Sequence, residues 1–471
     1  MAKRQRRRRE RRRRRHAQGV GWRTRHSVIT GVGVSAGAVL GVTAPAFGAA
    51  QTFYVGSLGD SNAAPPADCT DPTNTDCTLR QAVDAANLNT AQTDNVYFRS
   101  GLSGDIALTT GNGGEIPITD AIYLYGPGPD KVTVHAATGR RIFNVNPATP
   151  GDLVGIGGLT LTGGDVTGEG GAIFNDDAQL KVLNSVLSGN TASSKGGAIY
   201  EAGNYASGDA DFFRYSTFVN NHATQGGAIG ADIGWGTIRQ STFTGNGATA
   251  GNGGGLYGQR GYIYDSTFAG NNATGAGGGV ATDKIYLFGT ILANNTATSN
   301  PDLDTNSGYA GFDLVKNPGG LGFGSSVITG QDPQLGPLQN NGGYAPTLKP
   351  AAASPVVDQS NSAYTYDERF KPRVVDNPNR PNVTGGNGAD IGAVELSLAE
   401  GPQATPPSQT PVPVPPKKKC KKKKHKSSAR IAKKCKKKKK RSAASGHLRF
   451  RMPRAAPWPD SGEAHAFRLR P

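Results

Sequence analysis

Two short signatures alternate through the middle of the chain, and they constrain its fold more than any other feature. The first is a glycine pair followed by a small and an aliphatic residue, and it begins at residues 170, 196, 226, 253 and 277. The second places an apolar residue three positions before an asparagine, in the pairs Leu187/Asn190, Phe218/Asn221, Phe243/Asn246, Phe268/Asn271 and Leu292/Asn295. Repeats of about 24–31 residues with short apolar stretches and Gly/Asn turns indicate a solenoid.

The repeats predict β-structure and exclude the helical solenoids. No segment shows helical periodicity for more than two turns, and no regular leucine ladder is present. With 67 glycines and 30 prolines among 471 residues, the composition suits many tight turns. We therefore predict an all-β, right-handed parallel β-helix with coils about 4.8 Å apart, a small N-terminal helical cap and a disordered basic C-terminal tail.

Stacking of the coils gives each repeated residue a structural role. The rings of Phe218, Phe243 and Phe268 are expected to form an aromatic column inside the solenoid. The asparagines are expected to tolerate left-handed backbone and to hydrogen-bond between coils as a ladder of Asn190, Asn221, Asn246, Asn271 and Asn295. The glycine pair is expected to permit positive φ at a second corner.

The charge of the chain is divided by region. Residues 1–26 carry +12 and residues 401–471 carry +20, so the whole-chain charge of +17 leaves −15 for residues 27–400. The basic N-terminus leads to a short, glycine-rich apolar stretch at 28–42, which predicts a signal peptide cleaved near residues 46–50. A single membrane anchor is the alternative, although a span needs about 20 apolar residues. We expect an extracellular or cell-surface protein with no membrane span in the mature chain.

Export determines how the four cysteines are interpreted. In an oxidising compartment, Cys69 and Cys77 are predicted to form a disulfide, and two inert thiols are the alternative. Cys420 and Cys435 lie in the lysine-rich tail, and their pairing stays open.

Three parts of the chain resemble known modules. The alternating signatures resemble the repeats of polymorphic outer membrane proteins. Residues 77–82 (CTLRQA) resemble the CSLREA-type module that precedes secreted β-helices, with Gln81 where glutamate is usual. Residues 332–358, followed by DIGAVE at 390–395, resemble the C-terminal module of choice-of-anchor Q proteins. These resemblances imply a secreted β-helix with a surface-attachment tail. The lysine-rich end lacks alternating amphipathic strands, so autotransport is not implied.

Together these features predict six segments. They are the basic N-terminus and signal peptide (1–50), an N-terminal cap (51–104), the β-helix (105–315), an anchor-Q-like module (316–398), a Pro-rich linker (399–416) and a Lys-rich disordered tail (417–471). The tail is expected to bind an anionic polymer such as wall polymer, lipopolysaccharide or nucleic acid, in a salt-sensitive way.

A column of acidic residues raises the alternative of an enzyme. Aligning the coils on the glycine pair places Asp176, Ala202, Asp232, Gln259 and Asp283 in one column, with Glu201 beside it. Asp176, Asp232 and Glu201 are the catalytic candidates, yet two coils separate the aspartates by roughly 10 Å, just beyond the spacing of inverting glycosidases. Ca²⁺ held weakly by Asp176, Asp232 and Asp283 is the alternative metal site. Otherwise no cofactor is expected.

Acids near the C-terminus have a simpler interpretation. Asp358, Asp390 and Glu395 could form a catalytic set, but we expect them to occupy turns and caps. No nucleophile elbow, phosphate-binding loop, zinc motif or dinucleotide motif is present.

We therefore predict an exported, cell-surface-associated β-helix with a structural or adhesive role, which binds a polysaccharide or another surface ligand. A polysaccharide lyase or glycoside hydrolase is the alternative. Converging carboxylates with a basic residue and exposed aromatics would favour the enzyme, and Tyr257, Tyr262 and Tyr264 are the aromatics concerned.

Overall fold

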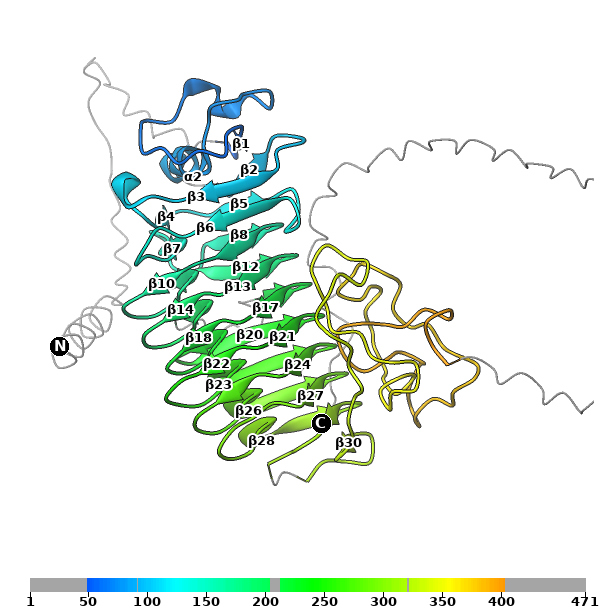
Figure 1. The fold of residues 1–471 in the computed structure, drawn as a ribbon. Helices are drawn as coiled ribbons and strands as arrows, with labels where there is room; N and C mark the ends of the chain where they lie inside the picture. The colour runs from blue at the N-terminus through cyan, green and yellow to red at the C-terminus, as the bar shows by residue number, and fades with distance from the viewer. Residues whose placement is uncertain (1–48, 91, 204–211, 320–321, 403–471) are drawn as a thin grey trace, which may run out of the picture. The chain divides into compact units, whose positions relative to one another are not determined.

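The computed structural model describes residues 49–90, 92–203, 212–319 and 322–402, which form a parallel β-helix (Figure 1). In these residues three parallel sheets of 15, 10 and 5 strands are joined by turns, and one α-helix lies at the N-terminal end. The predicted all-β solenoid with a helical cap is confirmed. The signal peptide, the Pro-rich linker and the Lys-rich tail fall almost wholly outside the described residues.

The strands of each sheet come from successive coils. Sheet A consists of β1 Thr52–Val55, β2 Asp94–Phe98, β4 Ile116–Ile118, β5 Ile122–Tyr125, β7 Phe143–Val145, β8 Leu153–Gly157, β11 Ile173–Asn175, β12 Gln179–Leu183, β15 Ile199–Glu201, β16 Phe212–Arg214, β19 Ile229–Ala231, β20 Gly234–Arg239, β23 Leu256–Tyr264, β26 Val280–Phe288 and β28 Leu303–Gly311. Sheet B consists of β3 Gly104–Ala107, β6 Val132–His135, β9 Thr160–Thr162, β13 Val186–Ser188, β17 Thr217–Val219, β21 Thr242–Thr244, β24 Thr267–Ala269, β27 Ile291–Ala293, β29 Leu314–Val315 and β30 Ile328–Thr329. Sheet C consists of β10 Asp165–Val166, β14 Thr191–Ala192, β18 His222–Ala223, β22 Gly247–Ala248 and β25 Asn272–Ala273.

In the five coils that begin with a strand of sheet C, the chain runs from sheet C through sheet A to sheet B. In the earlier coils sheet A receives two short strands per coil, for example β19 and β20. In the last three coils these two strands merge into the nine-residue strands β23, β26 and β28. Sheet A is therefore continuous across its width at the C-terminal end of the solenoid.

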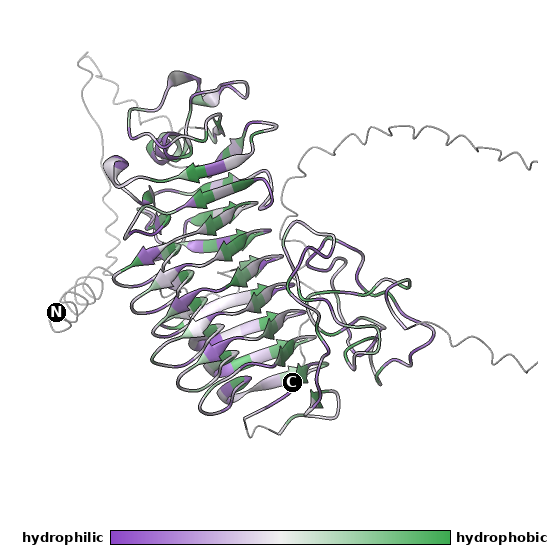
Figure 2. Cartoon of the chain, in the orientation of Figure 1, coloured by the Kyte–Doolittle hydropathy of each residue, from purple (hydrophilic) through white to green (hydrophobic). Residues whose placement is uncertain are grey.

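The repeated signatures supply two of the apolar columns in the core. The aliphatic residues after the glycine pairs pair in register along sheet A, from Ile173 through Ile199, Ile229 and Leu256 to Val280. In sheet B the rings of three phenylalanines stack with centroids 4.4 and 4.2 Å apart and planes 5° apart; they are Phe218, Phe243 and Phe268. Hydrophobic residues consequently recur at equivalent places in successive coils (Figure 2). Burial of one such side chain stabilises the fold by about 1.5–3 kcal/mol.

The buried asparagines form a continuous ladder, of which Asn246 is a typical rung. Its Nδ2 donates to Asn271 Oδ1 at 2.8 Å and to the Phe218 carbonyl at 2.9 Å. Its Oδ1 accepts from the Nδ2 and the backbone N–H of Asn221, at 2.9 and 3.0 Å. The expected left-handed backbone at these asparagines is wrong. The preceding residue adopts it instead, as at Gly245 with φ +67°, so the asparagine side chain can point inward.

The glycine pair occupies the corner between sheets C and A. Its first glycine is left-handed in every repeat, with φ between +64° and +72° at Gly170, Gly196, Gly226, Gly253 and Gly277. A Cβ on Gly196 would lie 2.0 Å from the Ile199 carbonyl oxygen, so both the dihedral and the space require glycine.

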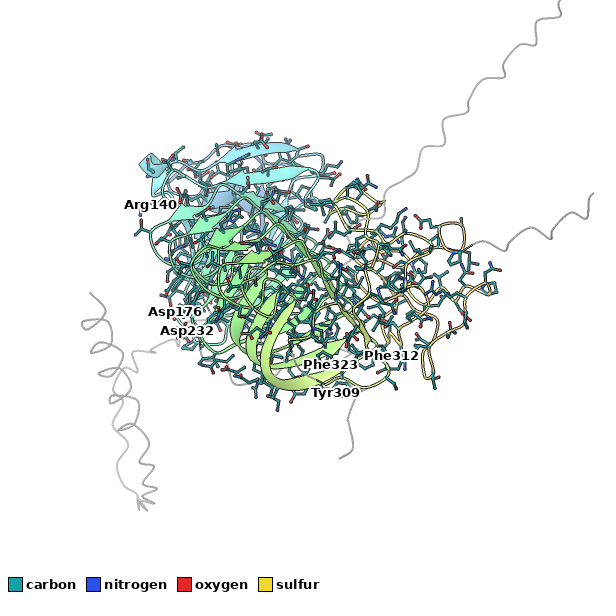
Figure 3. The ribbon with its side chains drawn as sticks, turned by 60° about the horizontal axis from the view of Figure 1, so that its bottom comes forward. Arg140, Asp176, Asp232, Tyr309, Phe312 and Phe323 are labelled. Atoms are coloured by element: carbon teal, nitrogen blue, oxygen red, sulfur yellow. A yellow bond between two sulfur atoms is a disulfide. The ribbon has the colours of Figure 1, made fainter. Side chains whose placement is uncertain are left out.

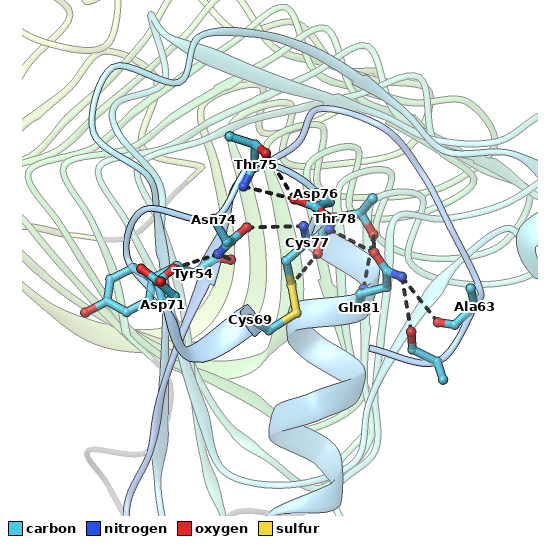
Figure 4. Close-up of a disulfide and its surroundings, with 11 residues drawn as sticks. Tyr54, Ala63, Cys69, Asp71, Asn74, Thr75, Asp76, Cys77, Thr78 and Gln81 are labelled. Atoms are coloured by element: carbon cyan, nitrogen blue, oxygen red, sulfur yellow. Dashed lines mark hydrogen bonds between the residues drawn. A yellow bond between two sulfur atoms is a disulfide. The ribbon is translucent and has the colours of Figure 1, made fainter. Parts of the chain in front are cut away.

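The N-terminal cap is a short helix and a disulfide loop (Figure 4). Helix α2 (Leu79–Leu88) begins with a capping box, in which Thr78 accepts from the Gln81 N–H and Gln81 Oε1 accepts from the Thr78 N–H. Glutamine thus does here what glutamate does in the usual form of the motif. The predicted Cys69–Cys77 disulfide is confirmed. No helix of the described residues is long and apolar enough to cross a bilayer.

Residues 330–402 fold back along the outer side of sheet B. Val356 and Ile391 pack against Ile291 of β27 in a small apolar cluster. Farther back along the sheet, the Ala393 N–H donates to Thr267 Oγ1 at 3.0 Å and Thr217 Oγ1 donates to the Pro346 carbonyl at 2.7 Å. The outward threonines Thr217, Thr242 and Thr267 of sheet B are buried.

Glu368 is an almost fully buried acid of that interface. Its carboxylate accepts from the hydroxyls of Thr217 and Thr242, and its backbone N–H donates to the Ala393 carbonyl. The neighbouring Arg369 bonds Asp367 at 2.8 Å instead. Burial therefore raises the pKa of Glu368 well above its usual value, against the lowering effect of the threonine hydroxyls.

Replacing a ladder rung should cost much more stability than replacing its exposed neighbour. Asn246→Ala leaves both the Nδ2 and the N–H of Asn221 without their acceptor, so we expect the free energy of unfolding of the full chain to fall by about 2–4 kcal/mol. Asn272→Ala is the matched control, because the Asn272 side chain is exposed and bonds only the Thr296 hydroxyl within the described residues. A change within about 0.5 kcal/mol is expected there. Equal losses in denaturant unfolding would contradict the ladder's role.

Glu368 should make folding stability depend on pH in a defined direction. Because its folded-state pKa lies above its unfolded value, its contribution is fully present at acid pH and is lost as the pH rises through the folded pKa. Glu368→Gln should therefore be more stable than wild type at pH 7.5, with the difference shrinking towards pH 4.

Glu400→Gln is the control for that pH series, because the pKa of Glu400 is shifted in the opposite direction from that of Glu368. Burial alone would raise the pKa of Glu400, but hydrogen bonds from Lys349 and Ser397 lower it to about 2. This substitution should destabilise the protein at neutral pH, and the loss should diminish as the pH falls below 4. If the difference in unfolding free energy between Glu368→Gln and wild type does not change with pH, Glu368 is not protonated in the folded protein.

Candidate functional site

A polar groove of about 240 Å³ opens on the outer surface of sheet A. It lies over β19, β23, β26 and β28, where the two halves of the sheet join. Its lining consists mostly of side chains that donate or accept hydrogen bonds: Lys195, Asp232, Asn252, Tyr257, Gln259, Thr282, Asp283, Asp304 and Asn306. We call this feature the polar groove.

One wall of the polar groove is an ion pair beside an aromatic ring. Lys195 Nζ lies 2.6 Å from Asp232 Oδ1, and both side chains are about one-quarter exposed. The same ammonium lies 5.8 Å from the centre of the Tyr257 ring. Lys195 directly precedes a corner glycine, whereas Asp232 follows β19 in the next coil, so the stacking of coils creates the pair.

The opposite wall comes from the last two coils. Asn306 Nδ2 donates to Asp283 Oδ1 at 3.1 Å, and Thr282 Oγ1 donates to the Gln259 carbonyl at 2.9 Å. Asp304 Oδ1 accepts from Asn300 Nδ2 at 2.7 Å. These bonds hold the amide and carboxylate groups in fixed orientations at the surface.

A row of tyrosines continues from the polar groove along the same strands. Tyr262 of β23, Tyr286 of β26 and Tyr309 of β28 are paired in register and form what we call the tyrosine row. The rings of Tyr262 and Tyr286 stack with centroids 4.8 Å apart and planes 15° apart. Tyr309 is 54% exposed at the end of the row. Polar groups and flat rings therefore lie along the same strands, on either side of two consecutive exposed residues in β23 and β26.

The structure separates the acids of the predicted column. Asp176 and Asp232 both lie on the same side of the coils (Figure 3), but only Asp232 and Asp283 line the polar groove. Glu201 is buried and accepts from Asn175 Nδ2 at 2.6 Å. Two coils separate Asp232 from Asp283, a rise of roughly 10 Å. A catalytic role for Asp176, Asp232 or Glu201 remains a prediction.

Metal binding by these acids likewise remains a prediction. In the described parts of the chain, no three His, Cys, Asp or Glu side chains are grouped so as to hold a metal ion. Asp232 is bonded to an ammonium group and Asp283 to an amide group, and both of these neighbours are hydrogen-bond donors.

Asp358, Asp390 and Glu395 accept hydrogen bonds from backbone N–H groups. Asp390 accepts from the N–H groups of Asp358 and Leu396, and Glu395 accepts from those of Val375 and Asp390. Burial, and then the charge of Glu395, raises the pKa of Asp390 well above its usual value. Such bonding serves turns and does not present a carboxylate to a substrate.

Several groove residues were missed in the sequence. Lys195 directly precedes a repeat glycine pair, but no lysine or arginine recurs at equivalent positions of the other coils. The repeat therefore does not predict a basic residue beside the acid column. Asn306 and Asp304 lie in the last coil, where the glycine-pair signature is lost. The pairing of β28 with β26 is what brings them to the polar groove.

Comparison with known protein families supports the repeat that the sequence shows over one stretch of the chain. Residues 184–200 match the family model of the Chlamydia polymorphic membrane protein (Chlamydia_PMP) repeat. They run from the turn before β13 to β15 and include Asn190 and the glycine pair at 196–197. No curated protein and no solved structure matches the chain. The predicted resemblance is confirmed over this stretch, and the repeat and the β-solenoid together fit a surface-exposed β-helix protein.

Proposed function

We propose that this protein is a cell-surface-associated β-helix that binds glycans through the polar groove and the tyrosine row, in a structural or adhesive role. The observation that carries the proposal is the occurrence, along the same three strands, of fixed hydrogen-bonding side chains and flat aromatic rings, with Tyr257 in the polar groove itself. Sugars present hydroxyl groups at their edges and apolar C–H groups on their faces, so this combination suits them.

The rigidity of sheet A supports binding by this face. The groove side chains stand on strands β23, β26 and β28, whose positions are set by parallel pairing along nearly their whole length. Side chains held on strands lose little conformational entropy when a ligand binds. A linear glycan lying across the coils would meet equivalent groups at intervals of about 4.8 Å.

Attachment to the surface is the part of the proposal that rests on sequence alone. The lysine-rich tail would hold the protein on an anionic polymer after export and signal-peptide cleavage. The resemblances to CSLREA-type and choice-of-anchor Q modules support the same placement, because both accompany secreted β-helices.

A polysaccharide lyase or glycoside hydrolase is the second candidate. The polar groove contains two carboxylates, a lysine and an aromatic ring, which are the residue types that such an enzyme needs. Against it, the Asp232 carboxylate is held in an ion pair by the Lys195 ammonium group at 2.6 Å, which engages it within the protein.

The proposal predicts glycan binding that depends on Tyr257. The full chain would be applied to a glycan array, and product release would be followed by reducing-end and unsaturated-product assays. Tyr257→Ala should weaken binding of a hit about tenfold, because an aromatic contact surface is lost. Tyr344→Ala is the matched control, because Tyr344 is an exposed tyrosine outside the polar groove. It should bind as wild type does.

Two outcomes would reject the binding proposal. Release of product that Asp232→Asn abolishes would make the protein an enzyme. Equal weakening by Tyr257→Ala and Tyr344→Ala, or no binding at all, would remove the polar groove from the function.

A further inference from the structure

Two arginines stand side by side on neighbouring coils of sheet A. Arg214 of β16 and Arg239 of β20 are register partners in the parallel ladder, so their backbones are separated by one coil, about 4.8 Å. Both side chains are half-buried on the outer surface. We call them the arginine pair.

Both guanidinium groups contact the same two aromatic rings. Arg214 Cζ lies 5.7 Å and Arg239 Cζ 5.3 Å from the centre of the Tyr364 ring. The corresponding distances to the Phe212 ring are 5.9 and 4.8 Å. Cation–π contacts of this kind hold a guanidinium in place without consuming its hydrogen bonds. Two like charges are thus fixed next to each other.

No carboxylate makes a direct contact with the arginine pair within the described residues, although the charge of Arg239 acts to lower the pKa of the buried Asp265. Neither arginine forms an ion pair there, and no acceptor binds their terminal amino groups. Arg214 Nε donates to Gln240 Oε1 at 3.0 Å, whereas Arg239 Nε is buried without an acceptor. The nearby Asp265 is bonded to Arg373 at 3.1 Å and to the Ser362 hydroxyl.

Gln240 adds a further donor without an acceptor. Its side chain is fully buried, and its Nε2 has no hydrogen-bond partner. The bond from Arg214 Nε fixes the orientation of the amide, because an arginine N–H requires an oxygen acceptor. The region around the arginine pair is therefore rich in donors and poor in acceptors, a state that a bound anion would relieve.

We infer that the arginine pair is a binding site for the oxyanion of an acidic sugar, either a carboxylate or a sulfate. Guanidinium groups bind such planar or tetrahedral oxyanions through two parallel N–H bonds. The inference rests on the proposed function for the ligand class, since it adds a charge requirement to glycan binding.

The surroundings favour a sugar over a free ion. Arg239 is the register partner of Tyr264, which lies two residues beyond Tyr262 on the same side of β23. A sugar acid bound at the arginine pair would thus have the tyrosine row beside it for the next rings of the chain. Tyr364 comes from the segment that folds back along sheet B, so that segment completes the site.

The test measures binding of the full chain to an oligogalacturonate, to its carboxyl-reduced neutral form and to a sulfated oligosaccharide. High salt suppresses long-range attraction to the lysine-rich tail, which every variant shares. Wild type should bind at least one acidic ligand more tightly than the neutral one. Arg214→Gln and Arg239→Gln should each weaken acidic binding about tenfold or more, through loss of charge-assisted hydrogen bonds.

Matched variants separate the site from general charge effects. Arg140→Gln removes the same charge from an exposed arginine near the N-terminal coils (Figure 3) and should leave affinity unchanged. Arg239→Lys keeps the charge but loses the planar fork, so it should also weaken binding, and it serves as the folded alternative if Arg239→Gln does not fold. A tail-driven attraction would leave Arg239→Lys unchanged.

Other outcomes would overturn the inference. Equal affinity for acidic and neutral ligands, or equal weakening by Arg140→Gln and Arg239→Gln, would show that no site exists here. Neutral-glycan binding that depends on Tyr257 but not on the arginine pair would retain the proposed function and reject this inference alone.

Discussion

The buried asparagine ladder is the interaction on which the rest of the structure depends. Each rung satisfies the backbone N–H of the preceding coil, so it fixes the register between coils as well as their spacing. All rungs donate in the same direction, and hydrogen bonds aligned in this way strengthen one another. The ladder ends at Asp302, where the last asparagine requires an acceptor and no further donor. The Oδ1 of Asp302 accepts from the N–H and the Nδ2 of Asn295. A parallel ladder of serine and threonine hydroxyls ends likewise at Asp313.

Fixed register on the inside produces ordered rows on the outside. Because outward residues of successive coils are also register partners, like side chains collect in lines, as in the tyrosine row and the arginine pair. Such lines suit a polymer that repeats, whereas a single small molecule needs an enclosed pocket. The polar groove lies over the merged strands of the last three coils.

Much of the fold could be predicted from the sequence, because every coil places the same residue in the same environment. The core columns follow from the repeated signatures, and the helical cap follows from the motif at residues 77–82. The disulfide follows from the oxidising compartment that export implies. The contents of the polar groove could not be predicted in the same way. Lys195 and Asp232 come together across coils whose loops differ in length, and Asn306 belongs to a coil without the signature. The described segment after residue 330 contains no strand, so its packing along sheet B rests on contacts such as Glu368 with Thr242, which no periodicity reveals.

Hydroxyl-radical footprinting of the full chain, with and without an acidic oligosaccharide, tests the account most directly, since it reports the exposure of individual side chains. The account predicts that Phe218, Phe243 and Phe268 are unreactive in both states. Oxidation of Tyr257, Tyr262 and Tyr286 should be measurable in the free protein and should fall when the sugar binds. Tyrosines that react equally with and without the sugar, or phenylalanines that react as readily as tyrosines, would contradict a rigid core carrying a glycan-binding face.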